Sequence, residues 1–290
     1  MFNLIRAEWK KLLGNRLLAS FTVWLYPTGL FAFILVMAII HLLGGATDQE
    51  LGGNWHAPML STLELVTRFP NSSFSRLPLL AFMAVMCAGE YEWGTWKNIV
   101  PRNRRHKIIL AKIITLALVL VVAIGLTSII SGPVRYGVAQ LLGFEAAPTL
   151  LPHEIGAFFG EYALEVSIAF LQSLFLACFA LFAALITRTI VGSLLLSFGL
   201  SLLEMLSMFI LVIFGRFVGM PGLVNGYAFF PSYLFDNLRA WILTGTYMNT
   251  GITAFTSNLA LPTTILRLVI ALGLTIGLCT AIFQRQDITS

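Results

Sequence analysis

Long apolar runs alternate with polar segments along the chain. Six of these runs are close to the roughly 20 residues that a helix needs to cross the hydrocarbon core of a bilayer. They cover about residues 19–43, 73–90, 108–131, 159–186, 190–214 and 264–283. We therefore expect an all-α membrane protein, in which residues 1–290 form a single transmembrane domain with six spans.

The first 16 residues have a different pattern, in which apolar and charged side chains alternate with helical spacing. At about 100° per residue, one face of a helix over 2–16 gathers Phe2, Ile5, Trp9, Leu12 and Leu13. The cations of this segment project elsewhere and are Arg6, Lys10 and Lys11. We expect an N-terminal amphipathic helix that lies in the membrane interface with its cations toward the lipid headgroups.

The polar segments between the runs predict the connections. Loops are expected over 44–72, 132–158 and 215–262, a charged connection over 90–107, and a tight turn over 187–189. Within the third loop, residues 231–243 carry apolar side chains at helical spacing. They predict a short interfacial or re-entrant helix.

Composition restricts the class of protein. Of the 290 residues, 58% are hydrophobic and only 11% are charged, whereas a soluble domain has roughly 25% charged residues. A water-soluble enzyme is therefore excluded, and little length remains for a separate nucleotide-hydrolysing domain. The cysteines and histidines show no metal-ligand spacing.

The distribution of cations predicts the orientation in the membrane. If the N-terminus is cytoplasmic, 12 of the 18 lysines and arginines, including every lysine, fall on the cytoplasmic side. These 12 residues are Arg6, Lys10, Lys11, Arg16, Lys97, Arg102, Arg104, Arg105, Lys107, Lys112, Arg188 and Arg285. The positive-inside rule then predicts that both termini are cytoplasmic.

The connection between the second and third spans carries the most distinctive chemistry. Residues 89–112 contain carboxylates and aromatic side chains first, then Pro101, and then a cluster of cations. Aromatic and arginine side chains are frequent in protein interfaces. The same residue types also form the aromatic and basic belt of an ordinary membrane interface, so both interpretations stand on the residues alone.

This connection resembles the cytoplasmic segment of ABC-2 type transporter permeases. In that family a Glu-x-Gly-Thr stretch follows the second span, and a Pro-x-Arg-like turn leads to a small residue and Lys at the start of the third. The matching residues are Glu92, Gly94, Thr95, Pro101, Arg102 and Lys112. The run Pro-Arg-Asn-Arg-Arg departs slightly from the commoner Pro-x-x-Arg forms. The amphipathic start and six spans extend the resemblance, which is greatest to compact exporters of drugs or antimicrobial peptides.

The resemblance implies a membrane subunit of a bacterial exporter in the cytoplasmic membrane. Two such permeases, identical or related, would pair with two separate ATPase subunits that bind ATP and Mg. A short coupling helix would contact the ATPase through Glu90, Tyr91, Glu92, Trp93, Gly94, Thr95 and Trp96. A cytoplasmic basic cluster follows it, formed by Arg102, Arg104, Arg105, Lys107 and Lys112. The amphipathic helix would be the elbow that also touches the ATPase.

ATP binding is not expected in this chain itself. Gly89 and Gly94 have the spacing of a phosphate-binding loop, but Lys must follow the second glycine directly. Thr95 and Trp96 separate Gly94 from Lys97. Hydrolysis therefore falls to a partner, and we expect no catalytic residue, cofactor or metal in this chain.

Ionisable residues within the spans suggest where a substrate passes. Such groups are costly in a bilayer and mark functional sites by default. We expect Glu165, Gln172 and Glu204 to line a path for a cationic or polar substrate. The alternative is that they hold helices together, for example by pairing with Arg216 or Arg267.

Two other functions compete with an ATP-driven exporter. A self-contained ion-coupled carrier or channel could use Glu165 and Glu204 as a proton or cation relay. A membrane-embedded enzyme is disfavoured because the sequence has no nucleophile–base pair or metal cluster.

Overall fold

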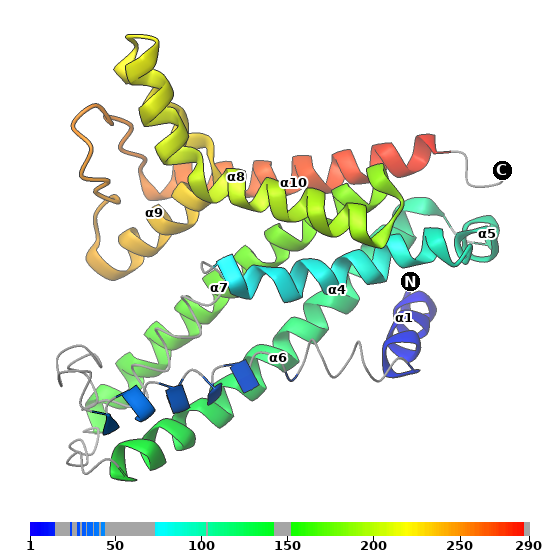
Figure 1. Cartoon of the computed structure of the whole chain (residues 1–290), viewed down its shortest axis with the longest axis horizontal. Coiled ribbons are helices and arrows are strands. Elements are labelled where there is room, and N and C mark those ends of the chain that lie inside the picture. Colours follow the sequence, from blue (N-terminus) through cyan, green and yellow to red (C-terminus); the bar gives the residue numbers. More distant parts are fainter. Residues whose placement is uncertain are drawn as a thin grey trace. The chain divides into compact units, whose positions relative to one another are not determined.

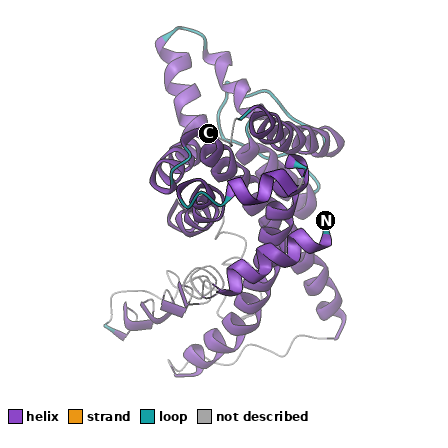
Figure 2. Ribbon diagram, turned by 90° about the vertical axis from the view of Figure 1, so that its right-hand side faces the viewer, coloured by secondary structure: helices purple, strands orange, loops and turns teal. Residues whose placement is uncertain are grey.

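The computed structural model describes residues 1–14, 73–102, 104–141 and 152–286, with isolated positions between 24 and 43. This described part is helical and contains no strand (Figure 2). The predicted first span, 19–43, and the loop over 44–72 lie wholly or mostly outside the described residues.

The helices follow one another along the chain as labelled in Figure 1. They are α1 (Phe2–Gly14), α4 (Ser73–Glu92), α5 (Trp96–Ile99), the 3-10 helix η2 (Val100–Arg102), α6 (Arg105–Leu141), α7 (Pro152–Thr187), α8 (Ile190–Phe217), the 3-10 helix η3 (Pro221–Phe229), α9 (Pro231–Thr244) and α10 (Leu261–Arg285).

The chain divides into two compact units. The first comprises Met1–Phe82 and Leu110–Leu174, and the second comprises Met83–Ile109 and Phe175–Ser290. The boundary falls inside α4, α6 and α7, so each of these helices contributes residues to both units.

Four helices in the described part have the length and composition to cross a membrane. They cover Arg105–Ile130, Phe159–Thr187, Ile190–Phe217 and Leu261–Arg285. These segments confirm four of the predicted apolar spans as helices and are those of a multi-pass membrane protein. The second predicted span, 73–90, is also helical, within α4. Its crossing of the membrane stays a prediction.

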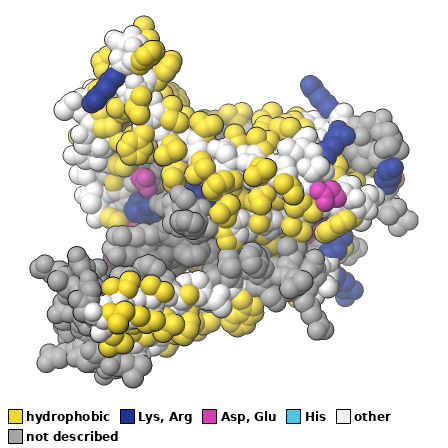
Figure 3. Space-filling model, viewed as in Figure 1, with side chains coloured by type: hydrophobic (Ala, Val, Ile, Leu, Met, Phe, Trp, Pro, Cys, Tyr) yellow, Lys and Arg dark blue, Asp and Glu magenta, His cyan; other side chains and the backbone are white. Residues whose placement is uncertain are grey.

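The α8 helix shows the inverted pattern of a membrane helix. Its buried positions are small or polar: Ser193, Ser197, Ser201, Glu204, Ser207 and Gly215. Its exposed positions include Leu195, Ile213 and Phe217, the last with an exposed fraction of 88%. Hydrophobic side chains also cover the visible surface along α8 and α10 (Figure 3). Lipid can solvate such a surface, and small buried residues let neighbouring backbones approach closely.

Two helices are longer than the sequence predicts. The expected loop over 132–158 is wrong at both ends, because α6 continues to Leu141 and α7 begins at Pro152. Pro133 removes one backbone hydrogen bond within α6 without ending the helix. Pro152 is the first residue of α7, a position at which a backbone N–H would have no partner within the helix, so its absence costs no hydrogen bond.

The segment over 218–260, which we call the cap, is an ordered element of the second unit. The helix predicted over 231–243 is confirmed as α9, but η3 is not anticipated within the predicted loop. Tyr227 and Tyr233 pack edge to face with ring centroids 5.4 Å apart, and Phe255 lies 5.2 Å from Tyr233. η3 packs on α8 and α9 packs on α10, so the cap rests on two of the candidate spans.

Asn237 is the polar centre of the cap and is fully buried. Its Oδ1 accepts the Met248 N–H at 2.8 Å. Its Nδ2 donates to the Leu259 carbonyl at 3.1 Å and to Thr264 Oγ1 at 2.8 Å. One side chain thus joins α9 to the loop that follows it and to the first turn of α10.

We expect Asn237→Ala to destabilise the cap, because it leaves the Met248 N–H without this partner. An unsatisfied buried donor costs about 1–3 kcal/mol. The measurement is the thermal unfolding of the detergent-solubilised chain, with the exposed Asn249→Ala as control. Equal unfolding temperatures for both variants would contradict the central role of Asn237.

Candidate functional site

The segment expected to form one coupling helix consists of the end of α4, a turn and the short helix α5, all in the second unit. Residues 90–92 end α4, residues 93–95 form a turn, and Trp96 begins α5. Gly94 has a φ of 65°, in the left-handed region that only glycine adopts without strain. The Thr95 N–H donates to the Glu90 carbonyl at 3.0 Å and closes the turn. The backbone conformation of this turn thus explains why the Glu-x-Gly-Thr stretch has a glycine at position 94.

The side chains of this segment separate into a buried and an exposed set. Glu90 and Trp96 are buried, with exposed fractions of 4% and 3%. Tyr91 and Thr95 are half-buried, whereas Glu92, Trp93 and Gly94 are exposed. The sequence predicts all seven as contacts for a partner, but the structure turns only some of them outward.

Trp93 has a defined position although 60% of its surface is exposed. A Cβ added at Gly89 would lie 3.1 Å from two atoms of the Trp93 ring. The absence of a side chain at 89 therefore lets the indole pack against the last turns of α4. Its outer surface, with the exposed Lys97 of α5, remains available to a partner.

Glu92 ties the segment to the start of α8. Its Oε1 accepts the Ile190 N–H at 2.7 Å. The first N–H groups of a helix lack partners within it, and a negative charge there is favourable. Thr189 adds a second cap by accepting the Gly192 N–H at 3.2 Å. The glutamate of the Glu-x-Gly-Thr stretch thus caps the N-terminus of α8.

Tyr91 connects the segment to the ends of α7 and α10. Its hydroxyl donates to Gln286 Oε1, and Gln286 Nε2 donates to the Leu185 carbonyl. The Arg188 guanidinium lies 6.0 Å from the centre of the Tyr91 ring. Burial raises the pKa of the Tyr91 phenol, although Arg188 acts in the opposite direction. The phenol therefore stays protonated and able to donate.

The predicted basic cluster does not form one surface. Arg104 and Lys107 are exposed, and Arg105 is half-buried. Arg105 Nη1 donates to the carbonyls of Phe283, Gln284 and Gln286 at 2.8, 2.9 and 2.6 Å. The side chain of Arg102 lies outside the described residues, and Lys112 belongs to the first unit, where it is buried.

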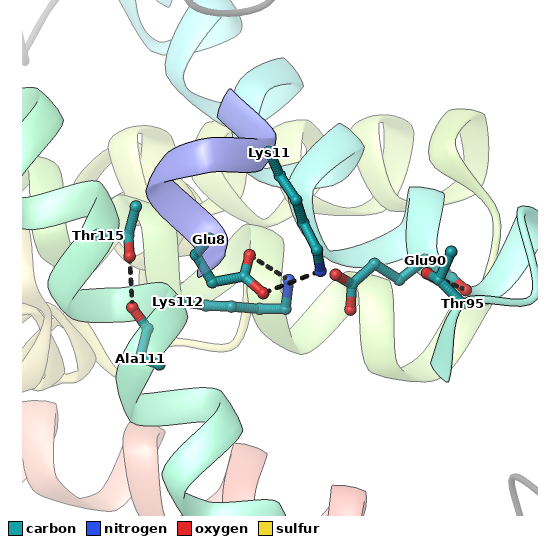
Figure 4. A network of polar contacts seen from close by, with 7 residues as sticks. All are labelled: Glu8, Lys11, Glu90, Thr95, Ala111, Lys112 and Thr115. Carbon is teal, nitrogen blue, oxygen red and sulfur yellow. Dashed lines mark hydrogen bonds and ion pairs between the residues drawn. The ribbon is translucent and has the colours of Figure 1, made fainter. Parts of the chain in front are cut away.

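Lys112 pairs with Glu8 of α1 inside the first unit (Figure 4). The Nζ and Oε2 atoms lie 3.2 Å apart, and Lys11 approaches the other carboxylate oxygen to 3.1 Å. Burial raises the pKa of Glu8, but the charges of Lys112 and Lys11 outweigh it and hold that pKa below 4.5. This pair attaches the predicted elbow helix to α6.

Glu8 is a residue that sequence reasoning missed. The helical pattern of α1 draws attention to its apolar side chains, yet Leu12 and Glu8 are its buried residues. The available signal was Lys112, a cation within an apolar run, because a buried charge needs a partner of opposite sign.

The polar residues expected along a substrate path fall in both units. Glu165 and Gln172 belong to the first unit, where they are buried and lie seven residues apart on one face of α7. Glu204 belongs to the second unit and is buried on the polar face of α8. Arg267, one alternative partner of these carboxylates, donates to the Ala228 carbonyl at 3.0 Å and lies over the Phe229 ring.

Within the residues that the structure describes, no group of three or more His, Cys, Asp or Glu side chains could hold a metal ion. The three cysteines are all buried.

Comparisons with known proteins leave the family open. No protein-family model matches the chain, and no curated protein is similar in sequence. The resemblance to a family therefore stays an expectation from the sequence.

Glu92→Ala should destabilise the N-terminus of α8, since it removes a capping acceptor that is worth about 0.5–2 kcal/mol. Glu92→Gln keeps an acceptor and should lose less. Thermal unfolding of the two variants measures the difference, with the exposed Glu161→Ala as control. The capping role would be wrong if Glu92→Ala unfolded at the wild-type temperature.

Glu8→Gln should weaken the attachment of α1 to α6, because it removes the charged carboxylate that the buried Lys112 pairs with at 3.2 Å. Breaking a buried pair costs about 3–5 kcal/mol, and replacing both partners by leucine should recover most of the loss. Limited proteolysis near residue 14 and thermal unfolding measure both effects. The exposed Lys10→Gln is the control.

The pH dependence of this pair has a definite sign. The pKa of Glu8 is lowered in the folded chain, so its stabilising contribution is fully present above the ordinary value of 4.5. It is lost as the pH falls through the folded-state pKa. The stability difference between wild type and Glu8→Gln should therefore shrink on acidification. An unchanged difference would contradict the ion pair.

Proposed function

We propose that the chain is the transmembrane permease subunit of an ATP-driven ABC-2 type exporter. It crosses the bacterial cytoplasmic membrane six times with both termini in the cytoplasm, and α1 is its interfacial elbow. Two permeases, identical or related, pair with two ATPase subunits that bind ATP and Mg. The substrate path includes Glu165, Gln172 and Glu204.

One observation supports the coupling role above all. Residues 89–102 have an exposed turn and hydrogen bonds that lead, directly or through Gln286, to three helix ends. Glu92 binds the start of α8, and Tyr91 reaches the ends of α7 and α10 through Gln286. A protein that moves the turn would therefore move the ends of three helices of the second unit.

The exposed chemistry of this end indicates the kind of surface it binds. Trp93 is a large aromatic side chain with few rotamers, the type that dominates binding energy at interfaces. The second unit also exposes the cations Lys97, Arg104, Lys107, Arg188 and Arg285. An ATPase surface with an apolar pocket and an acidic rim fits this combination.

A second function has an observation of its own. Glu165 and Glu204 are buried within candidate spans, as expected for the proton or cation relay of an ion-coupled carrier. Such a carrier works without ATP and without a soluble subunit. The contacts of residues 89–102 favour the exporter, since a carrier has no need for a turn tied to three helix ends.

Trp93→Ala and Lys97→Glu should each weaken binding of the ATPase subunit about tenfold or more, while the membrane domain stays folded. Both side chains are exposed, so their loss removes contacts to the partner and little internal packing. Co-purification and the affinity for the separately purified ATPase measure this. The control is Tyr247→Ala, an exposed aromatic residue of the cap.

The cap lies at the other end of α8, which is about 42 Å long at 1.5 Å per residue. Tyr247→Ala should therefore leave ATPase binding unchanged. Transport by the purified chain alone, without ATP and with no ATPase bound, would refute the exporter and establish the ion-coupled carrier.

A further inference from the structure

The helix α10 is held at its two ends. Its buried residues are Thr264 near the start and Cys279 and Phe283 near the end. Between them it exposes large apolar side chains, among them Val269 and Leu274 with exposed fractions of 63% and 68%. The attachments at the ends therefore decide how this helix moves with the rest of the second unit.

At the C-terminal end, Arg105 holds the carbonyl groups that α10 leaves unpaired. The last four carbonyls of a helix have no partner within it, and a cation there is favourable. The guanidinium binds two of these carbonyls, those of Phe283 and Gln284, and also the carbonyl of Gln286, the residue after α10. It also lies 5.8 Å from the centre of the Phe283 ring, whose other contacts include Trp96 at 4.7 Å.

Gln286 completes this attachment from the residue after α10. Its amide nitrogen binds the Leu185 carbonyl of α7, and its amide oxygen accepts the Tyr91 hydroxyl of α4. We call Arg105, Gln286 and Tyr91 the C-terminal clasp. Figure 1 shows α5 and the C-terminal end of α10 at the same end of the second unit.

At the other end, α10 is bound to the cap. Thr264 Oγ1 accepts from the buried Asn237 amide at 2.8 Å, and Arg267 donates to the Ala228 carbonyl of η3 at 3.0 Å. The part of α10 between Thr264 and Phe283 is about 28 Å long at 1.5 Å per residue. One continuous helix thus joins the candidate coupling site to the cap.

We propose that α10 transmits movement of residues 93–102 to the cap, and that Arg105 and Gln286 are the positioning residues that make it do so. This inference rests on the proposed function, since the ATPase supplies the movement. Neither residue contacts the substrate. An α-helix with an intact hydrogen-bond ladder is stiff along its axis, so displacement at the clasp displaces Thr264 and the bonds it shares with α9.

The first experiment needs no ATPase. Hydrogen exchange is measured on the purified chain in nanodiscs for Arg105→Ala, Arg105→Lys and Gln286→Ala. The clasp predicts faster exchange in the last turn of α10 and in residues 93–102 for both alanine variants, with a smaller effect for lysine, which keeps a donor. Gln284→Ala is the matched control, because that side chain is exposed and only its backbone carbonyl is used. Unchanged exchange in the alanine variants would overturn the clasp, whatever the function.

The second experiment uses the reconstituted complex with its ATPase. Gln286→Ala and Arg105→Lys should bind the ATPase and hydrolyse ATP within twofold of wild type, but transport per ATP hydrolysed should fall about tenfold for Gln286→Ala and less for Arg105→Lys. A reporter, Tyr247→Cys in the cap, should change its labelling rate on addition of ATP and Mg only when the clasp is intact. A loss of folding lowers hydrolysis and transport together and leaves their ratio unchanged.

The outcomes separate the two proposals. Normal transport per ATP and a normal ATP-dependent change in cap labelling in Gln286→Ala would overturn transmission through α10. Failure of the wild-type chain to bind any ATPase would overturn the proposed function and with it the transmission. The hydrogen-exchange result would still decide whether the clasp exists.

Discussion

Unpaired backbone groups at helix ends are the constraint on which the second unit depends. Every helix leaves N–H groups at its start and carbonyls at its end without partners. Near residues 89–105 these groups meet Glu92, Arg105 and Gln286, which bind the start of α8 and the ends of α10 and α7, in that order. Three helices are thereby joined to one connecting segment, and the packing of Trp96 on Phe283 fixes its position.

The interior of the spans follows a different rule from that of a soluble protein. On α8 the buried side chains are mostly serines and the exposed ones are large and apolar. The Ser193 hydroxyl donates to the Ala180 carbonyl at 3.2 Å and links α8 to α7. With lipid outside, tight packing of small residues and a few hydrogen bonds hold helices together, because apolar burial gives little driving force.

Sequence patterns predict the spans more completely than the site. The apolar runs predict α6, α7, α8 and α10 because a membrane helix is encoded by local composition. The helix α9 follows from spacing, while η3 does not, since its fold depends on Tyr227 packing against Tyr233. The loop predicted over 132–158 begins too early, because Pro133 removes one hydrogen bond from α6 but does not end the helix.

The candidate site is only partly predictable from the sequence, because it too depends on contacts between residues far apart in the chain. The pattern over 89–102 identifies the segment, but the partners of Glu92, Arg105 and Lys112 come from residues about 100 to 180 positions away. Nothing in the local sequence distinguishes the buried Trp96 from the exposed Trp93. Their different roles follow from the turn at Gly94, which directs one indole into the unit and the other outward.

We propose that residues 89–102 bind a separate ATPase. Its most direct test is to replace Trp93 by a photoreactive amino acid, irradiate intact cells, and identify what becomes cross-linked to the chain. We expect a cross-link to a soluble ATPase subunit, and we expect it to be lost when the photoreactive residue is placed at Tyr247 in the cap. A cross-link confined to lipid, with no ATPase captured, would contradict it.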